Sequence, residues 1–159
     1  MNIRHDRAED IDAIRRLLIA AFGVPAEAKL VDGLREDGDL ALALVAEDAG
    51  DVVGYVAFSP LKSPARALAL APVAVSPSRQ RQGIGSALIQ EALRRARDLG
   101  CDIIFVVGEP AYYSRFGFAA EAALDFDSAY AGPYFMALCL SETPVEPAPV
   151  VYSDRFAAL

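Results

Sequence analysis

The chain has 159 residues, a length that suits one domain built around a single hydrophobic core. Its residues are 54% hydrophobic and 23% charged, and no apolar run approaches the roughly 18 residues that a membrane-spanning helix needs. The net charge of -7 disfavours a nucleic-acid phosphate backbone as a partner and mildly favours a cationic one. We therefore predict one globular domain that binds neither nucleic acid nor membrane.

The N-terminus, the cysteines and the histidine exclude further classes. The first ten residues lack the basic region, apolar core and cleavage site of a secretory signal, so a cytoplasmic location is expected. Cys101 and Cys139 are too few and too far apart for a disulfide or metal framework, and each lies in an apolar run that predicts a buried thiol. His5 has no cluster of ligands beside it, so no metal site is predicted.

The first half of the chain predicts two helices and an antiparallel hairpin. Asp6 with Glu9 resembles a capping box at the start of the first helix, and Gly23 supplies its stop. Turn residues 48–51 separate two apolar, partly alternating runs. The predicted elements are a strand over Asn2–His5, a helix over 11–22, a helix over Ala26–Glu36, and strands over Leu40–Glu47 and Val52–Ser59.

The second half predicts a strand, a helix and a further strand, followed by a short helix and a last strand. These elements cover Ala67–Val75, Gly85–Leu99, Ile103–Val107, a turn of helix opened by Pro110, and Tyr134–Leu140. The crossover helix implies that the strands on either side of it run parallel. Pro72 lies inside the first of these strands and removes a ladder hydrogen bond, which implies an edge, a bend or a bulge. We predict a mixed sheet with helices on both faces.

The stretch from Val73 to Ser86 reads V-A-V-S-P-S-R-Q-R-Q-G-I-G-S and predicts a site for a phosphate group. A strand ends at Val75, two glycines allow a tight turn, and a helix then begins with its N-terminus facing the turn. The exposed N–H groups and the partial positive charge of such a helix end favour an anion.

Two common phosphate-binding loops do not fit this stretch. A P-loop needs a lysine after its second glycine, and none follows Gly83 or Gly85. A dinucleotide-binding loop needs a third glycine where this chain has Leu88, and Asp102 lies at the wrong end of the next strand to bind a ribose. A nucleoside triphosphatase and a dinucleotide-binding module are therefore disfavoured, although the two glycines could also serve only as a tight turn.

Two motifs carry a resemblance to a known family. Residues 80–85 read Q-R-Q-G-I-G and match the Q/R-x-x-G-x-G/A signature of the GNAT superfamily of N-acetyltransferases, at the place between strand and helix where that family has it. Residues 112–118 read Y-Y-S-R-F-G-F and resemble the family's F-Y-x-x-x-G-F segment. The chain resembles a GNAT acetyltransferase over most of its length. The sequence P-A-Y-Y-S-R-F-G-F at residues 110–118 looks closest to a bacterial subgroup of predicted acetyltransferases.

The resemblance implies an α/β GNAT fold, with a mixed central sheet of about six to seven strands flanked by about four helices. It implies that acetyl-CoA, as acyl donor and without a metal, lies in a V-shaped opening between the strands over Ala67–Val75 and Ile103–Val107. Pro72 gives this chain its own physical reason for such an opening. The backbone of Val73, Ala74 and Val75 would pair with the pantetheine amides. The pyrophosphate would lie on the loop formed by Gln80, Arg81, Gln82, Gly83, Ile84, Gly85 and Ser86.

The family motif also implies catalytic roles. Tyr113 is the candidate general acid for the departing thiolate, with Tyr112 as its neighbouring competitor. The fourth strand contains no carboxylate, so Glu109, at the end of the fifth strand, is the candidate general base; His5 or a chain of waters are alternatives. Gly108-Glu109-Pro110 replaces an asparagine that some members carry there. A backbone N–H of the fourth strand, that of Val75, would polarise the carbonyl.

These observations predict an N-acetyltransferase that moves an acetyl group from acetyl-CoA to a primary amine by direct attack. The acceptor is a small molecule or a protein amine, and the sequence does not choose between them. A homodimer is left open, as is an acyl group longer than acetyl. The alternative is a non-catalytic acyl-CoA sensor or interaction module with the same fold.

Overall fold

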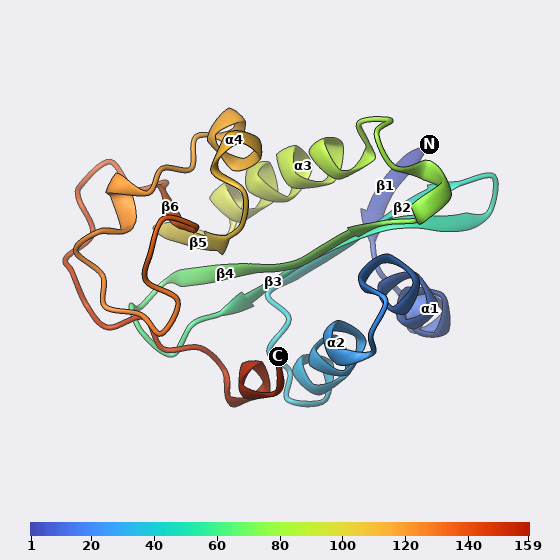
Figure 1. The fold of residues 1–159 in the computed structure, drawn as a ribbon, viewed down its shortest axis with the longest axis horizontal. Helices are drawn as coiled ribbons and strands as arrows, with labels where there is room; N and C mark the ends of the chain where they lie inside the picture. The colour runs from blue at the N-terminus through green and yellow to red at the C-terminus, as the bar shows by residue number, and fades with distance from the viewer.

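A computed structural model describes all 159 residues, and its main elements lie where the sequence pattern predicts them (Figure 1). The strands are β1 (Asn2–His5), β2 (Leu42–Asp48), β3 (Asp51–Pro60), β4 (Ala67–Val75), β5 (Ile103–Val107) and β6 (Phe135–Cys139). The α-helices are α1 (Ile11–Phe22), α2 (Ala26–Glu36), α3 (Ile84–Asp98) and α4 (Pro110–Tyr113). None of these helices is long and apolar enough to cross a membrane.

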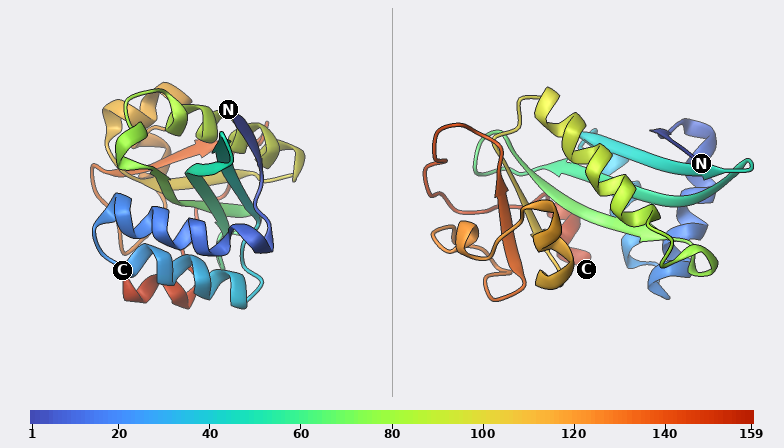
Figure 2. Two further views of the ribbon diagram at one scale, coloured as in Figure 1. Left: turned by 90° about the vertical axis from the view of Figure 1, so that its right-hand side faces the viewer. Right: turned by 90° about the horizontal axis from the view of Figure 1, so that it is seen from above.

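The six strands form one sheet in the order β1-β2-β3-β4-β5-β6. Neighbouring strands are antiparallel except β4 and β5, which run parallel because α3 carries the chain across between them. Helices α1 and α2 cover one face of the sheet, and α3 and α4 cover the other (Figure 2). The predicted mixed sheet with helices on both faces is confirmed.

Each face of the sheet buries its own apolar layer. On the α3 face, Leu88, Ile89 and Ala92 are fully buried in the core. On the α1 face, Ile14 and Leu18 pack in a separate cluster that reaches β2 and β3. The apolar stripes of the helices, spaced at three and four residues, are what hold them on the sheet.

Pro72 interrupts β4, as predicted. Val56 pairs with Val73 but Phe58 pairs with Leu70, so one residue of β3 faces two residues of β4. This is a β-bulge, and it changes which residues face α3: Leu70 before the bulge and Val73 after it. The pairing of β4 with β5 ends at Ala69 and Phe105, so the two strands separate beyond that point.

The start of the first helical segment differs from the predicted capping box. The N–H of Arg7 donates to Asp10 Oδ2 at 2.8 Å, so the acidic partner is Asp10, within a turn of 3₁₀ helix that precedes α1. Asp6 instead accepts from Arg35 of α2 at 2.7 Å. The reason is a tertiary contact, because α2 brings a guanidinium to Asp6 that the local sequence does not reveal.

The two cysteines have different environments. Cys101 is buried, as predicted, whereas Cys139 is exposed. Cys139 is the last residue of β6, the outermost strand of the sheet, and the only bridge on the outer side of β6 is that of Ala137 with Ala119. The prediction of a buried thiol at Cys139 was wrong because an apolar run at a sheet edge leaves its last residues uncovered.

The segment after β6 has structure that the sequence did not predict. Val151 bridges to Ser63, and a 3₁₀ helix follows over Asp154–Ala158. Arg155 in this helix binds Asp37, just after α2, through Nε at 2.8 Å and Nη2 at 2.9 Å. The C-terminus therefore lies beside α2 (Figure 1).

The packing of α3 predicts how two leucines of this segment will respond to truncation. Leu88 is fully buried, whereas Leu99, directly after α3, is 59% exposed. Leu88→Ala should lower the free energy of unfolding by about 2–5 kcal/mol through lost burial and the cavity left behind. Leu99→Ala, the matched control, should stay within about 0.5 kcal/mol of the wild type. Urea unfolding of the three proteins checks this, and equal losses would contradict the packing described.

Candidate active site

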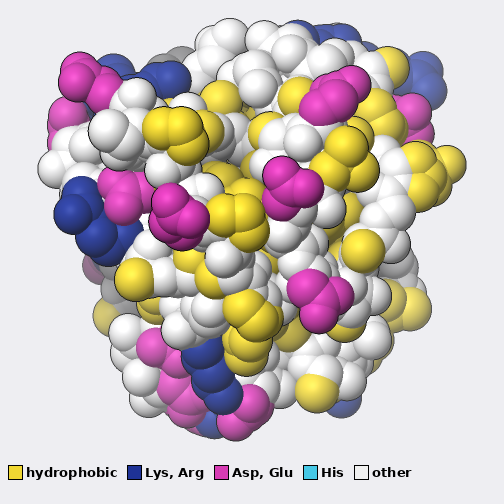
Figure 3. Space-filling model, turned by 90° about the vertical axis from the view of Figure 1, so that its left-hand side faces the viewer, with side chains coloured by type: hydrophobic (Ala, Val, Ile, Leu, Met, Phe, Trp, Pro, Cys, Tyr) yellow, Lys and Arg dark blue, Asp and Glu magenta, His cyan; other side chains and the backbone are white.

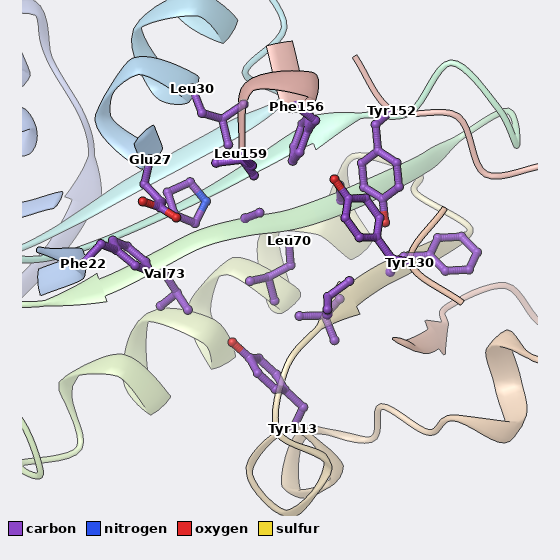
Figure 4. A pocket seen from close by; sticks show the side chains of 16 residues that line it. Phe22, Glu27, Leu30, Leu70, Val73, Tyr113, Tyr130, Tyr152, Phe156 and Leu159 are labelled. Atoms are coloured by element: carbon purple, nitrogen blue, oxygen red, sulfur yellow. The ribbon is translucent and has the colours of Figure 1, made fainter. Parts of the chain in front are cut away.

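A cavity of about 400 Å³ opens where β4 and β5 separate, and it passes from one face of the sheet to the other. On the α3 face its lining includes Leu70 and Tyr113. On the α2 face it includes Leu30 and Phe156. Figure 4 shows Tyr113 on one side of β4 and the α2 and C-terminal residues on the other. A reaction between two molecules that enter from opposite faces is therefore sterically feasible here.

The edge of β4 beyond Pro72 has free backbone groups. Ser76 N–H donates to Val53 of β3, and successive residues of a strand point their polar groups to opposite edges. The groups of Val75 and Val73 therefore point toward the gap, where β5 no longer pairs. Gln80 Nε2 donates to the Val75 carbonyl at 3.2 Å, which agrees with that direction. The backbone N–H and C=O of Ala74 face β3, where Ala74 pairs with Tyr55.

The glycine loop forms a second hollow at the start of α3. Gly83 has φ +81°, a conformation that a residue with a side chain adopts only with strain, and a Cβ placed there would meet open space. Arg81 also has a positive φ of 65°. The hollow is lined by Val75, Arg79, Gln80, Arg81, Gly83, Ile84, Gly85, Ser86, Tyr112 and Arg115. The first-turn amides of α3 and several guanidinium groups thus surround a space fit for an anion.

Not every residue of the predicted loop faces this hollow with its side chain. Ile84 is 3% exposed and packs in the core, so only its backbone is available. Gln82 is absent from the lining, and its Oε1 accepts from Arg79 Nε at 3.2 Å. Arg79 also donates to Asp48 at 2.7 Å and lowers the pKa of that carboxyl group. Arg79 is therefore partly neutralised, which leaves Arg81 and Arg115 as the less constrained cations.

The two adjacent tyrosines have separate places. Tyr112 lines the loop hollow, where its hydroxyl lies 3.2 Å from Ser86 Oγ and the Arg115 guanidinium lies 4.8 Å from its ring centroid. Tyr113 lines the cavity between the strands. Figure 4 shows its hydroxyl directed toward β4, near Leu70 and Val73. The structure thus separates two residues that the sequence left in competition.

Tyr113 is a buried phenol. Its side chain packs against Gly108, where any Cβ would collide with the tyrosine ring. Any residue with a side chain at position 108, asparagine included, would therefore displace the Tyr113 ring. Burial raises the pKa of Tyr113 to about 12, with a smaller contribution from Tyr112. The phenol is therefore neutral, and able to donate its proton, throughout the physiological pH range.

The carboxylate at the cavity is not the one that the sequence indicated. Glu109 is exposed and absent from the cavity lining, because it precedes α4 and its backbone carbonyl accepts the N–H groups of Tyr112 and Tyr113. His5 lies in a different hollow with Asp6. The carboxylate that does line the cavity is Glu27, in the first turn of α2.

Sequence reasoning also missed the residues that close the α2 side of the cavity. These are Phe22, Glu27, Leu30, Tyr130, Tyr152, Phe156 and Leu159. They come from distant parts of the chain and carry no local motif. The regions expected from the sequence to decide the acceptor, Phe22–Asp37, Pro60–Pro64 and Glu121–Pro133, show no diagnostic motif, and the C-terminal segment gave no signal at all.

Comparison with known proteins adds to this geometry. The model of the acetyltransferase (GNAT) family matches residues 11–118. The chain belongs to the GNAT acetyltransferase family. It is 42% identical over 136 residues to YhbS, an uncharacterized N-acetyltransferase of Escherichia coli K12, covering 83% of this chain and 81% of YhbS. It is 38% identical over 133 residues to YjhQ of the same organism, covering 79% of this chain and 71% of YjhQ.

Two similar solved structures contain a coenzyme. The GNAT N-acetyltransferase YhbS of E. coli in complex with CoA has a TM-score of 0.91 and 36% identity, covering 98% of this chain and 91% of that one. A GNAT acetyltransferase of Brucella melitensis in complex with acetyl-CoA has a TM-score of 0.85 and 35% identity, covering 98% and 97%. The GNAT fold is therefore established for this member of the family.

The contact between Gly108 and Tyr113 leads to a stability prediction. Gly108→Ala should destabilise the protein by about 1–3 kcal/mol, because the tyrosine ring has to move out of its packed position. Gly85→Ala is the control: its Cβ would lie 3.4 Å from the Tyr112 hydroxyl, so we expect a change below about 1 kcal/mol. Urea unfolding measures both, and an unperturbed Gly108→Ala protein would contradict the packing.

Proposed function

We propose that this GNAT protein transfers an acetyl group from acetyl-CoA to a primary amine by direct attack in a ternary complex. The observation that carries the proposal is the cavity between β4 and β5, which has Tyr113 on the α3 face and a carboxylate on the opposite face. A donor on one face and an acceptor on the other would meet in the gap. No covalent enzyme intermediate is needed for such a reaction.

The residues of the α3 face fit a CoA-type donor. The glycine loop offers the first-turn amides of α3 together with Arg81 and Arg115 to a pyrophosphate. The open space beside Gly83 is the space that a phosphate oxygen would fill. The free edge of β4 at Val73 and Val75 would pair with the pantetheine amides, as an added strand pairs with a sheet edge.

Tyr113 and β4 would then act on the thioester. An N–H of β4, that of Val75, would donate a hydrogen bond to the carbonyl oxygen as negative charge develops there. The Tyr113 hydroxyl would give its proton to the sulfur as the carbon–sulfur bond breaks. The raised pKa of Tyr113 keeps that proton in place until it is needed. Glu109 is exposed and does not line the cavity, so we assign it no step in the reaction.

Release of free CoA in the presence of acetyl-CoA and an amine tests the proposal directly. Binding of acetyl-CoA without turnover of any amine would instead support the sensor predicted as the alternative. Absence of acetyl-CoA binding in a calorimetric titration would remove both functions.

The conformation of Gly83 predicts a selective effect on the donor. Gly83→Ala should cost about 1–2 kcal/mol of stability through its positive φ, and Gly50→Ala, with φ +85° in the β2–β3 turn, should cost the same. Only Gly83→Ala should weaken acetyl-CoA binding, by about tenfold or more, since the new Cβ enters the anion hollow. Calorimetry on both variants checks this, and equal affinities would argue against the loop as the pyrophosphate site.

The place of Tyr113 predicts the behaviour of its phenylalanine variant. Tyr113→Phe should lower kcat by about 10²–10⁴-fold and leave acetyl-CoA affinity within about twofold. Tyr134→Phe, at a tyrosine that is 55% exposed and outside the cavity, is the control.

The pH profile provides a second readout for the same residue. Because the pKa of Tyr113 is about 12, the wild-type rate should rise with pH as the amine loses its proton and should not fall near pH 10. Unchanged turnover of Tyr113→Phe across that profile would remove Tyr113 from the mechanism.

A further inference from the structure

The α2 side of the cavity is lined almost entirely by apolar and aromatic side chains, with one exception. Among the 16 residues that line the cavity, Glu27 is the only one with a charged side chain. From this side of the cavity we infer that the acceptor is a small monoamine with an aromatic body and no carboxylate, whose ammonium group binds Glu27. This inference rests on the proposed acetyl transfer and adds the class of acceptor.

Glu27 has the environment of a carboxylate that awaits a cationic partner. It lies in the first turn of α2, and its side chain is directed toward β4 (Figure 4). Its Oε1 is buried and has no hydrogen-bond partner in the protein. Asp10, the one acidic residue that is buried as a whole, is by contrast paired with Arg4 at 2.8 Å. A buried carboxylate oxygen without a donor is costly, and a ligand ammonium would satisfy it.

Three aromatic side chains, those of Tyr130, Tyr152 and Phe156, pack in a row along this side of the cavity. The Tyr130 and Tyr152 rings pack edge to face with centroids 5.1 Å apart, and those of Tyr152 and Phe156 lie 5.0 Å apart. Phe22 lies at the other end of the lining, near Glu27 (Figure 4). Such a surface favours an aromatic ring by packing and an ammonium group by cation–π attraction.

The same lining excludes other amines. It contains no lysine or arginine, so the carboxylate of an amino acid or the phosphate of a phosphorylated amine would be left unpaired. It contains no second acidic side chain for the further charges of a polyamine. On the face of the molecule that Figure 3 shows, acidic side chains lie among hydrophobic ones and lysine and arginine lie mostly toward the margins, in keeping with the net charge of -7.

The size of the cavity favours a small acceptor over a peptide. Its 400 Å³ lies near the lower end of the roughly 300–1,000 Å³ typical of small-molecule sites, and the acetyl thioester would take part of it. The C-terminal 3₁₀ helix narrows the α2 side, since Arg155 is held by Asp37 while Phe156 enters the lining. An extended chain would have to displace this helix.

The reaction balances with these two residues. The ammonium group gives one proton to Glu27, which later releases it to solvent. The neutral nitrogen forms its bond to the carbonyl carbon as the carbon–sulfur bond breaks. The sulfur takes the Tyr113 proton, and the second proton lost by the nitrogen restores the phenol through solvent. The products are an N-substituted acetamide and free CoA.

A panel of four amines tests the class of acceptor. The amines are 2-phenylethylamine, phenylalanine, spermidine and a tetrapeptide with N-terminal phenylalanine, each assayed by CoA release beside calorimetric titration of acetyl-CoA. We expect kcat/KM for 2-phenylethylamine to exceed that of phenylalanine by about 100-fold or more, because the two differ only by a carboxylate that the site cannot pair. Spermidine and the peptide should be similarly poor.

Variants of single glutamates test the role of Glu27. Glu27→Gln keeps the size of the side chain and should lower kcat/KM for 2-phenylethylamine by about 10²–10⁴-fold with acetyl-CoA affinity unchanged. The deficit should shrink as the pH approaches the pKa of the free amine, which a purely structural role would not produce. Glu142→Gln, at an exposed glutamate after β6 that lies outside the cavity, should retain wild-type activity.

The outcomes separate this inference from the proposed function. Faster turnover of phenylalanine, spermidine or the peptide would overturn the class of acceptor and leave acetyl transfer standing. CoA release by none of the four amines would also overturn it, while bound acetyl-CoA would still support the donor site. A loss of activity in Glu109→Gln but not in Glu27→Gln would overturn the role of Glu27.

Discussion

The missing ladder hydrogen bond at Pro72 is the constraint on which the rest of this structure depends. Because β4 bulges there, its pairing with β5 stops at Ala69 and Phe105 and the sheet opens. The bulge also changes which residues face α3, so Leu70 and Val73 both line the same side of the gap. A sheet that would otherwise separate its two helical layers thus acquires a passage between them, together with backbone groups that have no partner strand.

The two faces supply different chemistry to this passage. The α3 face has the glycine loop, where helix amides and arginine side chains favour an anion, and the buried neutral phenol of Tyr113. The α2 face has aromatic side chains and one carboxylate, that of Glu27. The two sides of the cavity therefore differ in charge: the α3 side suits an anionic donor and the α2 side suits a cationic acceptor.

Stability and function are linked through the elements that hold the two faces in place. Leu88 anchors α3 to the sheet and so fixes the position of the glycine loop. Gly108 allows the ring of Tyr113 to lie against the end of β5. On the other face, Arg155 binds Asp37 and keeps Phe156 at the cavity. Ordinary packing contacts and one ion pair therefore hold both sides of the cavity in position.

The sequence by itself determined the main elements and the family, because helical period, turn residues, the proline and the glycine loop act locally. It predicted β4 and its interruption correctly, and Tyr113, its candidate general acid, lines the cavity. Only the tertiary structure decided the acceptor side. Glu27 and Phe156 meet through the packing of α2 against the C-terminal helix, and Tyr130 joins them from a distant loop. Glu109 lies outside the cavity, as the N-cap residue just before α4. Contacts between distant segments depend on how helices pack on the sheet and on each other, and no local pattern of residues encodes them.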